Sequence, residues 1–443
     1  MRFRYSTAKD GKPVKKAAVY TAEEHGIPLA NVDIDAIRVV ERLKASGYDS
    51  YIVGGAVRDL ILGKKPKDFD IVSEASPPRI KKIFRNSRII GNRFRLVHVY
   101  AGSKIFEVST FRSLKDGHTG NSFGTIEEDV LRRDFTVNSL FYDPQRQLVV
   151  DFVGGMKDIG KKRIRSIIPL PAIFTDDPVR MIRAVKYGAA TGFKLPLSLR
   201  WRIRRDSPLL AQVSPSRLTE EIGKIVHSSQ AARIVENLEA LGLFRYLQPN
   251  ASKLLKENPV FRERYLRDLA ATADGEGKPG WAMSALVRAF LEDATDWSRS
   301  DSQENYYSAF VAARRFVLPM NPPRLELDHA VRLVFAEHGF AVKRARFPIR
   351  LRDLEGGEDG ENPSGEGPSR SSAKGAARGA AKGAAQSAAR GVAQARVQDP
   401  AGSQAPGLRD PAGDPAGEPA PRKRPPRGGG EGPGKCGCVG LPA

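Results

Sequence analysis

Two carboxylates, Asp68 and Asp70, stand on either side of an aromatic residue in the segment KPKDFDIV, within a chain of formal net charge +21. If FDIV is a strand, both acids point to one face, while Phe69 and Ile71 point into the core. Paired carboxylates repel each other unless cations lie between them, and Mg²⁺ binds through a couple of carboxylates plus substrate phosphates. The pair predicts a two-ion site for phosphoryl or nucleotidyl transfer. The alternative is a solvated acidic pair at a strand start.

A double-glycine turn precedes this pair in the segment GGAVRD. Backbone N–H groups of Gly54 and Gly55 at a helix start can cradle a triphosphate, and Arg58 can reach its oxygens. A third acid, Glu107 in FEVSTFR, lies on a later predicted strand and could complete the metal cluster. Its alternative is an ordinary exposed strand residue. A glycine turn placed before a paired-acid strand is a stronger signal than either feature alone.

Hydrophobic periodicity and turn residues indicate the elements that position these groups. We expect the head to be a mixed sheet with helices. The predicted elements are helices over 34–43, 56–62 and 76–84, strands over 51–53 and 69–72, a hairpin of 95–101 and 105–111 turning at Gly102 and Ser103, and a mobile loop over 113–125.

Strand signals fade after about residue 165, and helical spacing takes over. Beyond 352 the chain is rich in Gly, Pro and Ala and has almost no apolar bulk, so it cannot offset the entropy of folding. The predicted organisation is a mobile N-terminal arm over 1–32, a catalytic head over 33–165, a helical neck over 166–240, a short helical body over 241–350, and a disordered tail with basic clusters over 351–443.

The charge distribution points to a polyanionic partner. Residues 351–443 hold 13 Lys and Arg and 11 Asp and Glu, so nearly all of the net charge lies before residue 351. Nucleic acid is the first candidate, an acidic membrane the second, and solubility the plain alternative. The two cysteines, Cys436 and Cys438, are too few for a disulfide framework or a structural zinc site, and we treat them as inert. No signal peptide or apolar run of membrane length is evident, so we expect a cytoplasmic protein without a membrane partner.

Five segments resemble, in order, the motifs of the class II nucleotidyltransferases, which comprise tRNA CCA-adding enzymes and bacterial poly(A) polymerases. They are YIVGGAVRDLILGKKPKDFDIV, FEVSTFR, RRDFTVNSLFYD, DFVGGMKDI and DDPVRMIRAVKYGAATGF. The resemblance implies an α+β nucleotidyltransferase head, similar to that of DNA polymerase beta, followed by an all-α neck and body. It also implies a two-ion site for Mg²⁺, with Mn²⁺ as the substitute.

The same resemblance implies roles for individual residues. Asp68 and Asp70 match the metal-binding acids, and Gly54, Gly55 and Arg58 match the triphosphate turn. Segments further along the chain match the ribose-holding and base-reading motifs. The ribose and phosphate residues are Arg133, Asp134 and Asn138, and the base-reading pair, expected on one helix face, is Asp177 and Arg180. Without the motif, an Asp/Arg pair three residues apart is an ordinary surface ion pair.

The segments IIGNRFRLVHV and KPKDFD and the N-terminal arm resemble the bacterial poly(A) polymerases more than the CCA-adding enzymes, although Asn92 replaces the usual basic residue. The implied activity is template-independent addition of AMP from ATP to RNA 3′ ends, with basic residues of the body and tail contacting the RNA backbone. CCA addition to tRNA is the alternative enzyme, and a catalytically inactive RNA-binding protein is the alternative class. The body of about 110 residues is shorter than the family leads us to expect.

Overall fold

The computed structural model describes residues 2–7, 13–91, 95–115, 117, 122–272 and 279–344. The predicted tail over 351–443, with Cys436 and Cys438, lies outside the described residues, as do Asn92 and part of the predicted loop over 113–125. Among the described residues, no helix combines the length and the apolar character needed to cross a bilayer.

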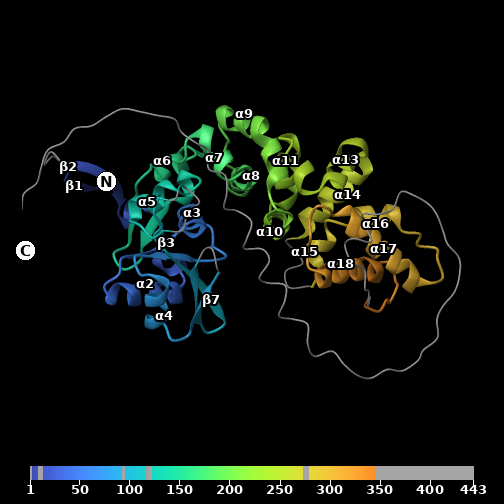
Figure 1. Cartoon of the computed structure of the whole chain (residues 1–443), viewed down its shortest axis with the longest axis horizontal. Helices are drawn as coiled ribbons and strands as arrows, with labels where there is room; N and C mark the ends of the chain where they lie inside the picture. Colours follow the sequence, from blue (N-terminus) through green and yellow to red (C-terminus); the bar gives the residue numbers. More distant parts are fainter. Residues whose placement is uncertain are drawn as a thin grey trace, which may run out of the picture. The chain divides into compact units, whose positions relative to one another are not determined.

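The head is built on a mixed sheet (Figure 1). Nine described strands follow the order β1-β2-β9-β8-β3-β4-β7-β6-β5. Strand β4 runs parallel to β7, and the other neighbouring pairs are antiparallel. The strands are β1 Arg2–Thr7, β2 Pro13–Tyr20, β3 Ser50–Val53, β4 Asp70–Ser73, β5 Ser87–Ile90, β6 Leu96–Ala101, β7 Lys104–Thr110, β8 Leu140–Asp143 and β9 Leu148–Asp151.

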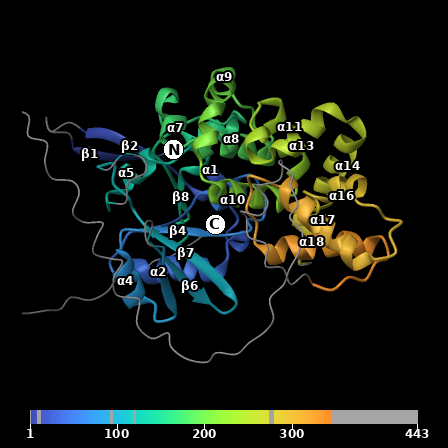
Figure 2. The same cartoon turned by 45° about the vertical axis from the view of Figure 1, so that its right-hand side comes forward.

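Central strands β3 and β4 send alternate side chains into two cores. Ile52 and Ile71 belong to the large core on one face of the sheet, whereas Val53 and Val72 belong to a small cluster on the other face. Helices α2 Ile34–Ala45 and α4 Pro77–Ile83 cover the first face, where Figure 2 shows them side by side. Helix α5 Ile126–Leu131 contributes to the second cluster. The period-two alternation therefore fixes which side chains of β3 and β4 reach each face.

Most predicted head elements are confirmed. The strand, glycine turn and helix appear as β3 and α3 Gly55–Ile61, and the predicted hairpin is β6 and β7. Ser76 is the N-cap of α4, with proline in its first turn. The remaining helices of the head are α1 Ala22–His25 and α6 Gly155–Gly160, with short 3-10 turns at Leu29–Asn31 and Thr136–Asn138.

The prediction of an irregular N-terminal arm was wrong for much of its length. Strand β2 pairs with β9 through Ala18, Val19 and Tyr20. Ala17 and Ala18 are buried, so the small residues of this strand pack on the sheet and the segment becomes part of it. The sequence did not reveal this because β2 is polar at its start and finds its partner about 130 residues further along the chain.

In the described part of the chain after residue 165, the regular elements are helices, as predicted, and β-bridges occur only at Ser166 and Lys194. Its apolar residues form the same large core as the first face of the sheet. The boundaries between the head, neck and body remain predictions. The helices are α7 Leu170–Asp176, α8 Val179–Thr191, α9 Leu197–Asp206, α10 Pro215–Val226, α11 Ala231–Ala240, α12 Phe244–Leu247, α13 Pro249–Glu257, α14 Pro259–Ala270, α15 Trp281–Ser284, α16 Arg288–Ala294, α17 Ser302–Phe316 and α18 Arg324–Glu337, with a 3-10 helix at Ser207–Gln212.

Candidate active site

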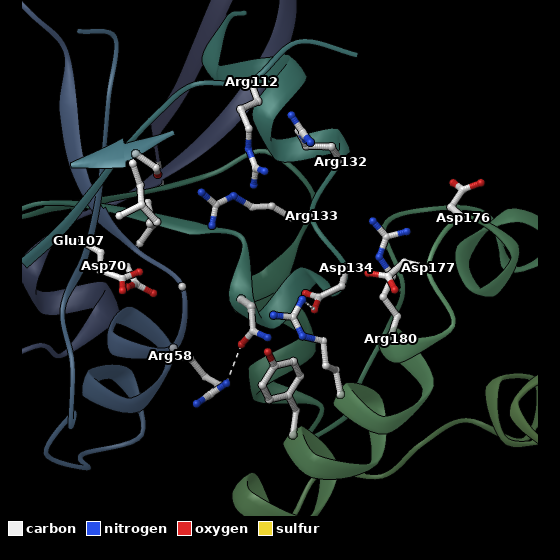
Figure 3. Close-up of a pocket in the computed structure, with 18 of the residues that line it drawn as sticks. Arg58, Asp70, Glu107, Arg112, Arg132, Arg133, Asp134, Asp176, Asp177 and Arg180 are labelled. Atoms are coloured by element: carbon white, nitrogen blue, oxygen red, sulfur yellow. Dashed lines mark hydrogen bonds and ion pairs between the residues drawn. The ribbon is translucent and has the colours of Figure 1, made fainter. Parts of the chain in front are cut away.

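A cavity of about 690 Å³ lies between the sheet of the head and helices α8 and α10 (Figure 3). Ten of the eleven site residues predicted from the sequence line it, and Asp68 alone does not. The ten are Gly54, Gly55, Arg58, Asp70, Glu107, Arg133, Asp134, Asn138, Asp177 and Arg180. Tertiary structure thus brings together residues from motifs spread over 127 positions of the chain.

The glycine turn lies directly against the start of strand β4. Val53, the last residue of β3, pairs with Asp70, the first residue of β4. The chain then turns at Gly54, whose φ of +77° is a conformation that residues with a Cβ rarely adopt. A Cβ on Gly54 would lie 3.5 Å from Oδ2 of Asp70. The backbone that is predicted to cradle the triphosphate therefore borders the carboxylate that is predicted to hold the metal.

Asp70 and Glu107 form the acidic end of the cavity, and Figure 3 shows their carboxylates close together. The pKa of Asp70 is raised to about 6, first because the cavity walls displace water and then because Glu107 and Asp68 are negative. Asp70 nevertheless remains accessible to solvent. Ionising Asp70 is unfavourable because it is partly desolvated and lies beside other acids. A bound cation would offset this cost by stabilising the negative charge.

The expectation that Asp68 and Asp70 share one face of a strand was wrong. Strand β4 begins at Asp70, because its partner β3 ends at Val53 and leaves residue 68 without a strand to pair with. Asp68 therefore lies in the irregular segment before β4, exposed, and does not line the cavity. It is still near enough for its charge to raise the pKa of Asp70.

The donor set of the acidic end fits a magnesium ion that is completed by substrate. Among the described residues, no group of three His, Cys, Asp or Glu side chains is arranged to hold a metal. Two carboxylates, Asp70 and Glu107, are available in the cavity. Mg²⁺ is usually held by one or two carboxylates together with substrate phosphates, so the site fits such an ion without a third protein ligand.

Arg58 is fixed on the floor of the cavity by two side chains. Its Nη1 donates to Oδ1 of Asn138 at 2.6 Å, and its Nε donates to Oδ1 of Asp59 at 2.8 Å. Arg58 and Asn138 are both buried. These two residues, predicted from separate motifs to hold phosphates and ribose, therefore form one hydrogen-bonded unit.

Arg133 and Asp134 are held by different partners. Arg133 donates from Nε and Nη2 to Oδ2 of Asp129, at 3.1 and 2.8 Å. Asp134 accepts from the N–H of Phe135 at 2.8 Å through Oδ1, and its Oδ2 lies 3.5 Å from Nη1 of Arg183. Both residues face the cavity with their orientation set by neighbouring groups.

Asp177 and Arg180 do not share a helix, which corrects the prediction. Asp177 is extended, with φ −153° and ψ 99°, and α8 begins only at Val179. The cause is Pro178, since a residue before proline is driven out of the helical conformation. Both side chains line the cavity even so, and the two oxygens of Asp177 each lie 3.0 Å from Nη2 of Arg217. Arg180 is buried, and this burial lowers its pKa.

Sequence reasoning missed several cationic residues of the cavity, which holds seven arginines and five acidic residues. Burial lowers the pKa of Arg132 to about 10, and the nearby charge of Arg112 lowers it further. Arg112 and Arg132 belong to the recognised segments FEVSTFR and RRDFTVN, so these motifs were the available signal. Arg217 carried no such signal because it lies 40 residues from its partner. The missed arginines are Arg112, Arg132, Arg183 and Arg217, and the sequence analysis also gave no role to Tyr187.

Comparisons with known proteins match both parts of this architecture. A family model described as "Poly A polymerase head domain" matches residues 50–165, and "Probable RNA and SrmB- binding site of polymerase A" matches residues 192–255. Poly(A) polymerase I of Salmonella typhi is 36% identical over 319 residues, covering 67% of this chain and 69% of that protein. The CCA-adding enzyme of Geobacillus stearothermophilus is 35% identical over 225 residues, covering 49% and 55%. The crystal structure of the Bacillus stearothermophilus CCA-adding enzyme in complex with CTP has a TM-score of 0.48 and 28% identity, covering 68% and 82%.

The likeness to poly(A) polymerase I covers about two thirds of the chain, whereas the likeness to the CCA-adding enzyme covers about half of it. The matched head model covers eight of the ten cavity residues, and Asp177 and Arg180 lie between the two matched ranges. By its motifs and its relatives, the chain belongs to the bacterial poly(A) polymerase family of nucleotidyltransferases.

Proposed function

We propose that this protein is a template-independent RNA adenylyltransferase, which adds AMP from ATP to RNA 3′ ends and releases pyrophosphate. One observation carries the proposal: a single cavity joins the acidic pair Asp70 and Glu107 to the arginine-rich floor and to Asp177 with Arg180. These are the parts needed to bind metal, triphosphate and base in one place. The family membership supports the same activity.

In the proposed reaction, the RNA 3′-hydroxyl attacks the α-phosphorus of ATP. A bond forms between the 3′-oxygen and the α-phosphorus, the bond to the bridging oxygen of the β-phosphate breaks, and pyrophosphate leaves. Two Mg²⁺ ions, for which Mn²⁺ is the substitute, would stabilise charge on the attacking and leaving oxygens. Asp70 and Glu107 would hold them, and we assign acceptance of the 3′-hydroxyl proton to the same acidic pair.

The cavity floor would orient the triphosphate and the ribose. Arg58 contributes a guanidinium already fixed by Asn138, so little side-chain entropy is lost when a phosphate binds. The cavity carries a formal excess of two positive charges, which suits a polyanionic nucleotide. Asp134 and Asn138 offer oxygens that can bond the ribose 2′-hydroxyl and so favour ribonucleotides.

Asp177 and Arg180 would read the base without a nucleic-acid template. A carboxylate accepts from the exocyclic amine of adenine, and a guanidinium donates to a ring nitrogen. Each side chain is anchored separately, Asp177 by Arg217 and Arg180 by a 3.3 Å hydrogen bond to the carbonyl of Ile173. Asp177 and Arg180 are therefore held by other groups, and we propose that both remain available to bind a base.

Helix α9 offers a surface for the RNA within the matched RNA-binding region. Trp201 is 61% exposed and the guanidinium carbon of Arg205 lies 5.4 Å from its ring. Aromatic rings and arginines on one exposed face are typical of single-strand binding, since bases stack on the ring and phosphates pair with the cations. The other exposed residues on this face are Leu197, Arg200 and Arg204.

The activity is tested by offering each of the four ribonucleoside triphosphates to the purified protein with a plain RNA primer and Mg²⁺. A ladder of added A residues with ATP supports the proposal. CTP use limited to two additions on tRNA lacking its end would instead identify a CCA-adding enzyme.

A matched pair of variants tests the site itself. Asp70→Asn removes the carboxylate at the cavity end of β4, and we expect it to abolish AMP addition. Glu74→Gln changes an exposed acid just after the other end of the same strand and should leave the rate unchanged. Undiminished activity of Asp70→Asn would remove the basis of the enzyme assignment.

A further inference from the structure

Tyr187 lines the cavity, although no motif reasoning gave it a role. It lies on α8, seven residues after Arg180 and four after Arg183. Residues at this spacing share one helix face, and all three line the cavity. Tyr187 is thus on the face of α8 that borders the cavity, and its ring also packs against the large core.

The ring of Tyr187 supports Arg58. The guanidinium carbon of Arg58 lies 5.5 Å from the ring centroid, within the range of a cation–π interaction. Phe135 meets the same ring edge to face, with centroids 6.0 Å apart and planes at 79°. One side of the ring therefore packs against Phe135 of the core. Another side contacts Arg58, the residue that is predicted to bind the triphosphate.

The hydroxyl of Tyr187 is a donor without a protein acceptor in the part of the chain that the structure describes. Burial raises the pKa of Tyr187 to about 12, so the phenol keeps its proton at neutral pH. Arg58 and Arg183 both act on it electrostatically and cannot accept its hydrogen bond, because a guanidinium is only a donor. The carboxylates of Asp134 and Glu221 also act on Tyr187 electrostatically, and neither accepts a hydrogen bond from its hydroxyl in the described part of the chain. The hydroxyl is therefore a donor beside two guanidinium groups, where a phosphate oxygen would be a suitable acceptor.

We propose that Tyr187 is a nucleotide-contacting residue whose hydroxyl donates a hydrogen bond to a phosphate oxygen of the incoming ribonucleoside triphosphate. Its ring holds Arg58 against the same phosphates. We favour a phosphate oxygen over a ribose oxygen as the acceptor because the ring of Tyr187 contacts Arg58. Arg58 follows the glycine turn and is predicted to bind the triphosphate. This inference rests on the proposed function and adds a specific contact to it.

Tyr187→Phe tests the hydroxyl alone, since it keeps the ring beneath Arg58. We expect the dissociation constant for ATP, measured by calorimetry with Mg²⁺, to rise roughly 10-fold, because a hydrogen bond to a charged acceptor is lost. Adenosine binding should not change. An equal loss for adenosine would place the contact on the ribose or base, and an unchanged ATP constant would remove the contact altogether. Either result overturns the proposal.

Tyr187→Leu tests the ring. It should weaken ATP binding more than Tyr187→Phe does, and the additional loss should disappear when Arg58 is already replaced by alanine, because the ring acts through Arg58. Additive losses would show that the ring does not act through Arg58. Tyr246→Phe, on α12 and outside the cavity, is the matched control and should bind ATP like the native protein. Thermal unfolding of each variant identifies any that fails to fold, and Tyr187→Phe then carries the test.

Failure of this inference is distinguishable from failure of the proposed function. If the native protein adds no AMP to RNA, the function fails, whatever the variants bind. If the native protein adds AMP and Tyr187→Phe binds ATP with the native constant, only the role of Tyr187 fails. The binding measurement needs no RNA, so it is independent of the primer.

Discussion

Both carboxylate oxygens of Asp177 lie 3.0 Å from Nη2 of Arg217, which is on α10, 40 residues further along the chain. The N–H of Val179 also donates to Oδ1 of Asp177, at 3.2 Å. These contacts hold the carboxylate in place before any nucleotide binds. The position of the Asp177 carboxylate is therefore set by α10 as well as by α8.

We expect Arg217→Ala to lower the preference for ATP over CTP. Adenine and cytosine present the same donor and acceptor pattern to an Asp/Arg pair, so discrimination depends on where the pair is held. Loss of the ion pair with Arg217 should lower kcat/KM for ATP roughly 10-fold. The kcat/KM for CTP should fall by a smaller factor. Single-nucleotide addition to a fixed primer measures both. Arg233→Ala on α11, exposed and outside the cavity, is the control; an unaltered ATP-to-CTP ratio in Arg217→Ala would contradict this prediction.

The magnesium requirement should increase steeply below about pH 6. The pKa of Asp70 is raised to about 6 by burial and by the neighbouring acids, so protons compete with the metal for this carboxylate as the pH falls through that value. The Mg²⁺ concentration that gives half-maximal AMP addition should be several-fold higher at pH 5.5 than at pH 7.5. Saturating Mg²⁺ should restore most of the rate at pH 5.5. A requirement that is the same at both pH values would argue against Asp70 as a ligand.

Trp201→Ala should weaken RNA binding without affecting ATP. The ring is exposed on α9, outside the cavity, and stacking on an aromatic ring contributes about 1–3 kcal/mol per base. We expect a roughly 10-fold higher dissociation constant for a single-stranded RNA by fluorescence anisotropy, with KM for ATP unchanged. Ile34→Ala, an exposed apolar residue of the head, is the control. Native RNA affinity in Trp201→Ala would exclude α9 as a stacking surface.

Asp268 should make the stability of the helical region depend on pH. This carboxylate on α14 is buried, and burial raises its pKa to about 6, whereas in the unfolded chain it returns to an ordinary value. The folded state then binds more protons between about pH 4 and 6, so stability falls as the pH rises through this window. Asp268→Asn should remove this decrease in the free energy of unfolding, which amounts to about 1–3 kcal/mol at pH 7.

Urea unfolding followed by tryptophan fluorescence measures this effect at pH 4.5 and pH 7. The difference between Asp268→Asn and the native protein should grow in favour of the variant as the pH rises. Asp293→Asn replaces an exposed carboxylate on the neighbouring α16 and serves as the control. Parallel curves for the native protein and Asp268→Asn would show that Asp268 does not titrate differently on folding.

Ten of the eleven residues predicted for the site line the cavity, and each lies in a short motif with its own local geometry. The glycine turn before an acidic strand start, and the arginines close to it, need only a few neighbouring residues to take their conformation. Local patterns also predicted the hairpin of β6 and β7 and the helical character of the chain after residue 165. Such features depend on periodicity and turn chemistry, which are written in consecutive residues.

Long-range packing decided the rest. Whether Asp68 belongs to a strand depended on where β3 ends, and whether the N-terminal segment is a strand depended on an edge offered by β9. The anchor of Asp177 on α10 and the support of Arg58 by Tyr187 join residues 40 and 129 positions apart. The sequence by itself determined which chemical groups are present and the local turns that present them. Only the tertiary structure decided which groups meet, because contacts between distant segments follow from how the whole core packs.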